Sequence, residues 1–179
     1  MKALVLYLSI TGNTEKAANS IHQGLLKGGM ETSLKKVKDA AEENFYDYDL
    51  VCFGSPSYHW NVPKPADDYL KAKFQEYTKE GRIKPGAPQV PGKNALIFCT
   101  YSGPHTGIRE AIPAGLYMGQ FFEHFGFNVI DEWYILSEFI KSEQNSTEGR
   151  MGNIKGLPDE RELQRLQDSA YNLAKTLIR

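Results

Sequence analysis

Residues 3–14 read ALVLYLSITGNT, an apolar run of six residues followed by six small or polar ones. Near-continuous apolar runs are typical of central parallel strands, which are covered on both faces. Directly after this stretch, the apolar residues between positions 17 and 25 recur at the spacing of one helix face. The segment therefore predicts a buried strand, a short loop over residues 9–14 and an amphipathic helix that Gly28 ends.

The alternation of apolar strands and amphipathic helices continues along the rest of the chain. Further strands are expected at residues 30–37, 50–53, 95–100 and 129–136, with helices between them and a last helix that Asp159 caps. The first and last of these four strands are more polar, so we expect them at the edges of the sheet. Five strands alternating with helices predict an α/β fold, a right-handed, doubly wound sandwich of three layers.

Composition limits the class of protein. The 179 residues are 41% hydrophobic and 24% charged, which suits a single domain over residues 1–179. The formal charge of -1 gives no net basic field for nucleic acid, and no apolar stretch of 18 residues indicates a membrane span. The short apolar run near the N-terminus has no signal-peptide cleavage pattern, so we expect a cytoplasmic protein. Cys52 and Cys99 lie in apolar runs without metal-ligand spacing and are interpreted as buried thiols.

Three loops are candidates for a binding site, because ligands of doubly wound sheets bind outside the carboxyl ends of the strands. They cover residues 9–14, 54–63 and 100–107. The first offers hydroxyls, an amide, backbone N–H groups and the positive end of a helix dipole, which together hold a phosphate without lysine or arginine. The alternative is a set of ordinary turn residues. Neither GxxxxGK[ST] nor a GxGxxG after a strand occurs in the chain.

The stretch SITGNTE at residues 9–15 resembles the phosphate-binding signature of flavodoxins, and the alternating elements extend the similarity over essentially the whole chain. The resemblance implies a flavodoxin-like, five-stranded parallel sheet of order 2-1-3-4-5 with helices on both faces. It also implies flavin mononucleotide (FMN) as the cofactor, with its phosphate held by Ser9, Thr11, Gly12, Asn13 and Thr14.

The second loop, GSPSYHWNVP at residues 54–63, suits the flavin ring. A large, flat ring needs an aromatic face and backbone groups aimed at its polar edge. In flavodoxin-like proteins this loop lies against the ring, which implies as site residues Pro56, Ser57, Tyr58, His59, Trp60 and Asn61. We expect Trp60 to stack on the ring. The alternative is a patch for a partner protein, or a loop folded back on the core.

The third loop, TYSGPHTG at residues 100–107, departs from the flavodoxin pattern. Flavodoxins commonly place acidic residues and a stacking tyrosine here, whereas this loop contains no carboxylate. The resemblance still implies as site residues Thr100, Tyr101, Ser102, Gly103, His105 and Gly107. Of these, Tyr101 is expected to shield the ring, and His105 fits a cofactor contact and a solvated position equally.

Two other α/β classes fail on the same loops. A receiver domain needs carboxylates after the first and third strands, where this chain has Ser9-Ile10-Thr11 and Gly54-Ser55-Pro56. A nucleophilic hydrolase needs a strained turn such as GxSxG, which GSPSYHW is not.

Three functions therefore remain open. The signature match favours an electron carrier between redox partner proteins. The non-acidic third loop and the segment 137–158, where Arg150 and Lys155 are candidates to reach a phosphate, favour an NAD(P)H- or quinone-dependent FMN oxidoreductase with a small-molecule electron donor or acceptor. A flavodoxin-fold binding module without a cofactor is the third possibility. A monomer and a homodimer both fit the sequence, and no metal site is expected.

Overall fold

Five parallel strands form the central sheet of the computed structural model, which describes residues 1–103 and 106–178. They are β1 (Lys2–Tyr7), β2 (Glu31–Lys36), β3 (Leu50–Pro56), β4 (Asn94–Tyr101) and β5 (Asn128–Leu136). Their order across the sheet is β2-β1-β3-β4-β5, and each neighbouring pair is parallel. The expected α/β fold and its strand order are confirmed, and the two more polar strands lie at the edges.

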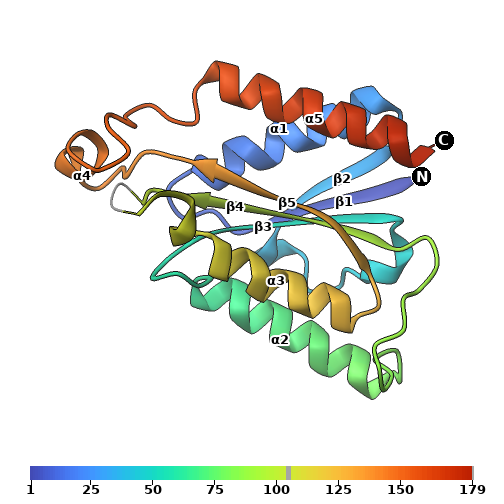
Figure 1. Ribbon diagram of the computed structural model, residues 1–179. Helices are drawn as coiled ribbons and strands as arrows, with labels where there is room; N and C mark the ends of the chain where they lie inside the picture. Colours follow the sequence, from blue (N-terminus) through green and yellow to red (C-terminus); the bar gives the residue numbers. More distant parts are fainter. Residues whose placement is uncertain (104–105, 179) are drawn as a thin grey trace.

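Helices cover both faces of the sheet (Figure 1). On one face lie α1 (Asn13–Gly28) and α5 (Glu160–Ile178), and on the other lie α2 (Lys64–Lys79) and α3 (Ile112–His124). The connections add the short helix α4 (Glu143–Thr147) and the 3-10 turns η1 (Val37–Asp39), η2 (Phe45–Asp47) and η3 (Gly107–Glu110). Each crossover from one parallel strand to the next thus lies on a face of the sheet, which gives three layers.

The face under α1 and α5 is packed with small residues. A Cβ atom added to Gly28 would lie 2.4 Å from the Cβ of Ala174, so α1 and α5 can approach closely only because position 28 has no side chain. The residue that caps α1 is Gly29, which has a φ of 100° and whose N–H donates to the Leu26 carbonyl. The helix ends at Gly28, as expected from the sequence, and Gly29 forms the left-handed cap that follows it.

The opposite face is aromatic. Under α2 and α3, the fully buried side chains include Phe45, Phe53, Phe122, Phe125 and Tyr77. The rings of Phe45 and Phe122 stack with centroids 5.4 Å apart, and Phe125 meets the edge of Tyr77 at 5.2 Å. Large rings fill this layer where the other face relies on close backbone approach.

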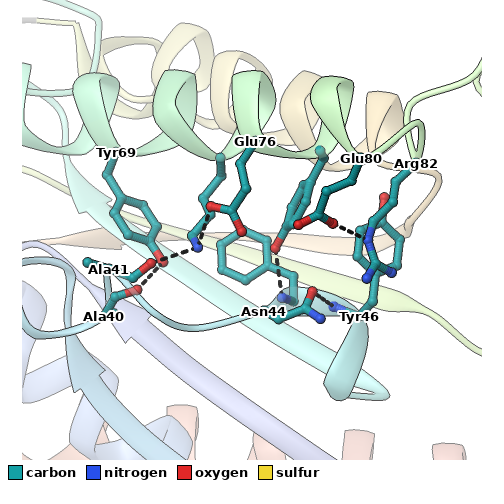
Figure 2. A network of polar contacts seen from close by, with 11 residues as sticks. Ala40, Ala41, Asn44, Tyr46, Tyr69, Glu76, Glu80 and Arg82 are labelled. Carbon is teal, nitrogen blue, oxygen red and sulfur yellow. Dashed lines mark hydrogen bonds and ion pairs between the residues drawn. The ribbon is translucent and has the colours of Figure 1, made fainter.

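Side chains of α2 form hydrogen bonds with the crossover between β2 and β3 (Figure 2). This crossover contains only short 3-10 turns, so part of its backbone needs partners elsewhere. Tyr69 Oη donates to the Ala40 carbonyl at 2.9 Å, and Lys73 Nζ donates to the Ala41 carbonyl at 2.8 Å. The side chain of Lys73 is only 3% exposed, and Glu76 balances its charge at 2.9 Å. Buried polar contacts thus hold the crossover against α2.

Because all five strands are parallel, their carboxyl ends meet at one edge of the sheet. The loops that follow β1, β3 and β4 gather at this edge, and α4 lies beside them, on the left in Figure 1.

Candidate functional site

A cavity of about 480 Å³ lies at the carboxyl ends of β1, β3 and β4. Its walls come from the first loop, from residues 56–60, from residues 100–103 together with Glu110, and from the segment 137–145. A cavity of this size is in the range of small-molecule sites. The structure thus brings the three loops selected from the sequence to one place and adds a fourth wall.

Most of the predicted site residues line this cavity: Thr11, Asn13, Pro56, Ser57, Tyr58, His59, Trp60, Thr100, Tyr101, Ser102 and Gly103. Within the described part of the chain, five others belong to the same loops but do not contribute to the lining: Ser9, Gly12, Thr14, Asn61 and Gly107. His105 lies outside the described residues.

The first loop ends at the start of α1. Gly12 is the N-cap of the helix, has a φ of 98° and leaves the helix start without a side-chain cap. Its own N–H donates to Ser9 Oγ at 3.1 Å, which holds the loop closed. The first N–H groups of a helix have no partner inside the helix, and the helix dipole makes this end positive. An anion is the ligand that such a helix start favours.

Asn13 has an unusual hydrogen-bond state. Its side chain is almost fully buried, and Nδ2 donates to the Glu138 carbonyl at 3.1 Å. Among the described residues, nothing donates to its buried Oδ1 atom. A reversed amide would place Oδ1 against the Glu138 carbonyl, two acceptors facing each other, so the bond to Glu138 fixes the orientation. A buried acceptor without a donor costs free energy, and a ligand hydroxyl or N–H in this cavity would supply the donor.

Thr14 belongs to the first loop but does not line the cavity. Its Oγ1 atom is 2.8 Å from Thr100 Oγ1, and both residues are buried. This hydroxyl pair joins the first turn of α1 to the end of β4, so it supports the cavity from beneath.

The second loop is a tight β-turn. The Tyr58 N–H donates to the Asn61 carbonyl at 2.7 Å, and the Asn61 N–H donates back to the Tyr58 carbonyl at 3.1 Å. The two central residues, His59 and Trp60, have φ values of 50° and 64°. These values define a type I′ hairpin, which usually contains asparagine and glycine. Bulky residues are strained in this conformation, and strained residues concentrate at functional sites.

Glu110, in η3, is a site residue that the sequence did not reveal. Its carboxylate lines the cavity, and its Oε2 atom accepts a hydrogen bond from Trp60 Nε1 at 2.6 Å. Its other oxygen accepts from Thr106 Oγ1, and its backbone carbonyl accepts from Ser57 Oγ. The 100–107 loop does lack a carboxylate, but the folded chain brings one to the cavity from three residues beyond it.

The fourth wall comes from the segment after β5. It contributes Ser137, Glu138, Phe139, Ile140, Lys141 and Asn145. The cation that this segment brings to the cavity is Lys141. Arg150 and Lys155, the candidates from the sequence, are not among the lining residues, and Lys155 pairs with Glu143 at 2.6 Å. No local pattern distinguishes Lys141 from Arg150 and Lys155, so the sequence did not indicate which cation of this segment reaches the cavity.

A charged cluster balances the first turn of α1. The Glu15 carboxylate accepts a hydrogen bond from Tyr7 Oη at 2.8 Å and pairs with Lys36 at 2.9 Å. The bond from Lys36, followed by that from Tyr7, lowers the pKa of Glu15. Lys36 therefore offsets an acidic charge that would otherwise oppose an anion at the helix start.

Burial is the main cause of the pKa shifts of three other titratable groups. Burial, with smaller effects of Glu162 and Cys99, raises the pKa of the Tyr101 hydroxyl. Burial also raises the pKa of both free thiols, Cys52 and Cys99. In residues 1–103 and 106–178, no group of three or more His, Cys, Asp or Glu side chains has an arrangement suited to a metal ion. In the same residues, no helix has the length and apolar character needed to cross a membrane.

Comparison with known proteins gives the class. The flavodoxin family model matches residues 5–103, more than half of the chain, and the chain belongs to the flavodoxin family. Proteins of this family bind a flavin.

Two curated proteins are similar in sequence to part of the chain. An NAD(P)H dehydrogenase (quinone) of Archaeoglobus fulgidus is 31% identical over 59% of this chain and 64% of the relative. A flavodoxin of Clostridium saccharobutylicum is 29% identical over 46% of this chain and 52% of the relative. The chain thus spans less than two thirds of the length of either relative.

Solved structures share the fold at low identity. Flavodoxin 2 of Bacillus cereus aligns with a TM-score of 0.67 at 18% identity over 98% of both chains. The flavodiiron protein of Giardia intestinalis aligns with a TM-score of 0.65 at 17% identity, over 99% of this chain and 36% of that one.

Proposed function

We propose that the protein binds FMN in this cavity and carries electrons between redox partners. The observation that carries the proposal is the pairing, in one cavity, of an uncapped helix start beside Thr11 and Asn13 with an aromatic hairpin at Tyr58–Trp60. FMN has a phosphate at one end and a flat ring at the other, which matches these two kinds of wall. We call residues 9–14 the phosphate end, and Ser57–Trp60 with Gly103 and Glu110 the ring end.

The phosphate end fits the polar part of FMN. The first N–H groups of α1 and the Thr11 hydroxyl are donors for a phosphate. Asn13 Oδ1 is an acceptor and therefore suits a hydroxyl rather than a phosphate oxygen. The ribityl chain of FMN carries hydroxyls, so we assign Asn13 to that chain, next to the phosphate.

The ring end fits the apolar part. The side chains of Tyr58 and Trp60 line the cavity, with the buried Tyr101 from β4. Aromatic rings of this kind stack on a flat ligand and exclude water from its face. FMN, when bound, supplies the group that accepts and releases electrons, while these residues hold and orient it.

The second candidate is an FMN oxidoreductase that uses NAD(P)H or a quinone. The relative from Archaeoglobus fulgidus is named as such an enzyme. The rim of the cavity also favours a neutral, flat reactant over a strongly charged partner protein, because its exposed side chains are largely apolar: Tyr58, Trp60, Phe139 and Ile140. Lys141 would add a cation for a phosphate of a nicotinamide dinucleotide.

Two measurements test these proposals. Titration of the protein with FMN and riboflavin, followed by visible absorption, should show one FMN per chain, bound more tightly than riboflavin. Equal affinity for both flavins would contradict the assignment of residues 9–14 to the phosphate. If neither flavin binds, the result would favour a binding module without a cofactor. The loaded protein is then mixed anaerobically with NADH or NADPH and a quinone. Negligible turnover supports the carrier, whereas rapid turnover supports the oxidoreductase.

A further inference from the structure

Glu110, in η3, is hydrogen-bonded to the loop that follows β3, which lies far from it in the sequence. Its carboxylate accepts a hydrogen bond from the Trp60 indole N–H, and its carbonyl accepts one from Ser57 Oγ. Glu110 therefore contacts both the first residue after β3 and a central residue of the hairpin turn. Its side chain also lies across Gly103, where an added Cβ atom would be 2.0 Å from Glu110 Cγ. No larger residue fits at position 103 unless Glu110 moves.

Trp60 has few other restraints. Its residue is 59% exposed, and its backbone is in the left-handed region that bulky residues avoid. An exposed indole in a strained turn gains little from packing, so the hydrogen bond to a carboxylate is the contact best placed to fix its orientation. Hydrogen bonds to charged groups are the stronger kind.

We propose that Glu110 is a positioning residue that holds the Trp60 indole in place at the ring end of the cavity. This inference rests on the proposed function.

Three variants test whether the hydrogen bond positions the indole. Glu110→Gln keeps an acceptor for the indole and removes the charge. Glu110→Ala removes both, and Trp60→Phe keeps a ring but removes the N–H donor. Glu123→Gln is the matched control, because this exposed carboxylate lies in the last turn of α3 and does not line the cavity.

Riboflavin affinity tests the positioning role, since riboflavin lacks the phosphate. Glu110→Ala and Trp60→Phe should each weaken binding by about 5- to 30-fold, whereas Glu110→Gln should stay within about twofold of the parent. The double variant Glu110→Ala with Trp60→Phe should bind as weakly as either single one, because both remove the same bond. Losses that multiply in the double variant would overturn the positioning role.

A measurement without flavin keeps the test independent of the proposed function. The chain has two tryptophans, so a Trp133→Phe background leaves Trp60 as the single indole emitter. In that background, fluorescence anisotropy should fall in Glu110→Ala but not in Glu110→Gln. Equal anisotropy in all three proteins would refute the positioning of Trp60 even if no flavin binds, whereas failure of the parent to bind flavin refutes only the proposed function. Circular dichroism checks that each variant is folded.

Discussion

The phosphate end and the ring end of the cavity are built in different ways. The phosphate end is six consecutive residues, of which Asn13 and Thr14 are almost fully buried. The ring end is assembled from residues as far apart as Trp60 and Glu110, fifty positions along the chain, and Trp60 is largely exposed. Burial fixes the first end before a ligand arrives. At the second end, the orientation of Trp60 depends on one exposed hydrogen bond, so the two ends differ in rigidity.

The largest effect is expected at the phosphate end, from Thr11→Val. The change removes a hydroxyl at nearly constant shape, and one hydrogen bond to a charged group is worth about 1 to 3 kcal/mol, or about 5- to 150-fold in FMN affinity. Riboflavin affinity should change less than about twofold, because the lost donor serves the phosphate. Parallel titrations with the two flavins measure the ratio. Thr176→Val, the same change on the exposed side of α5, is the control.

A smaller effect with the opposite pattern is expected at the ring end, from Trp60→Ala. Loss of an aromatic contact that remains partly exposed should weaken binding by about 1 to 2 kcal/mol, or about 5- to 30-fold. FMN and riboflavin should lose the same factor, because both carry the ring. A loss confined to FMN would show that Trp60 serves the phosphate instead, and unchanged quenching of flavin fluorescence would assign the stacking to Tyr58 or Tyr101.

The smallest effect concerns the charge balance beside the phosphate end. Lys36 and Tyr7 lower the pKa of Glu15, so the carboxylate stabilises the folded protein above its ordinary pKa of 4.5. This contribution is lost as the pH falls from that value through the lowered pKa. Because the pair is partly exposed, it should be worth less than about 1 kcal/mol.

Urea unfolding of the parent and of Glu15→Gln measures this contribution. The parent should be slightly more stable at pH 7, and the difference should shrink at pH 4. A difference that grows toward pH 4 would contradict the lowered pKa.

The strands and helices of this protein were largely predictable because their signals are local. The apolar run before residue 9 is β1, and the helical repeat that follows it is α1. A local pattern also predicted that α1 ends at Gly28. It did not show that Gly28 lies against Ala174 in α5, because that residue lies at the other end of the chain.

The candidate site divides in the same way. The SITGNT loop was predictable because one consecutive stretch contains the hydroxyls, the glycine and the helix start. Glu110 was not predictable, since its place depends on the 3-10 turn η3 and on a hairpin with two residues in the left-handed region. The segment 137–158 was selected from the sequence, but for Arg150 and Lys155 rather than for residues 137–145, which form the wall. The place of this wall depends on contacts between distant segments, such as that between Asn13 and Glu138.

The sequence by itself determined the order of strands and helices, the edge of the sheet where the loops meet and the loop suited to a phosphate. These features follow from periodicity and from residue types at neighbouring positions. Only the tertiary structure decided which carboxylate faces the cavity, which lysine lines it and what holds Trp60. These side chains come from segments that only the folded sheet brings together, and contacts between distant segments depend on loop conformations that no local pattern encodes.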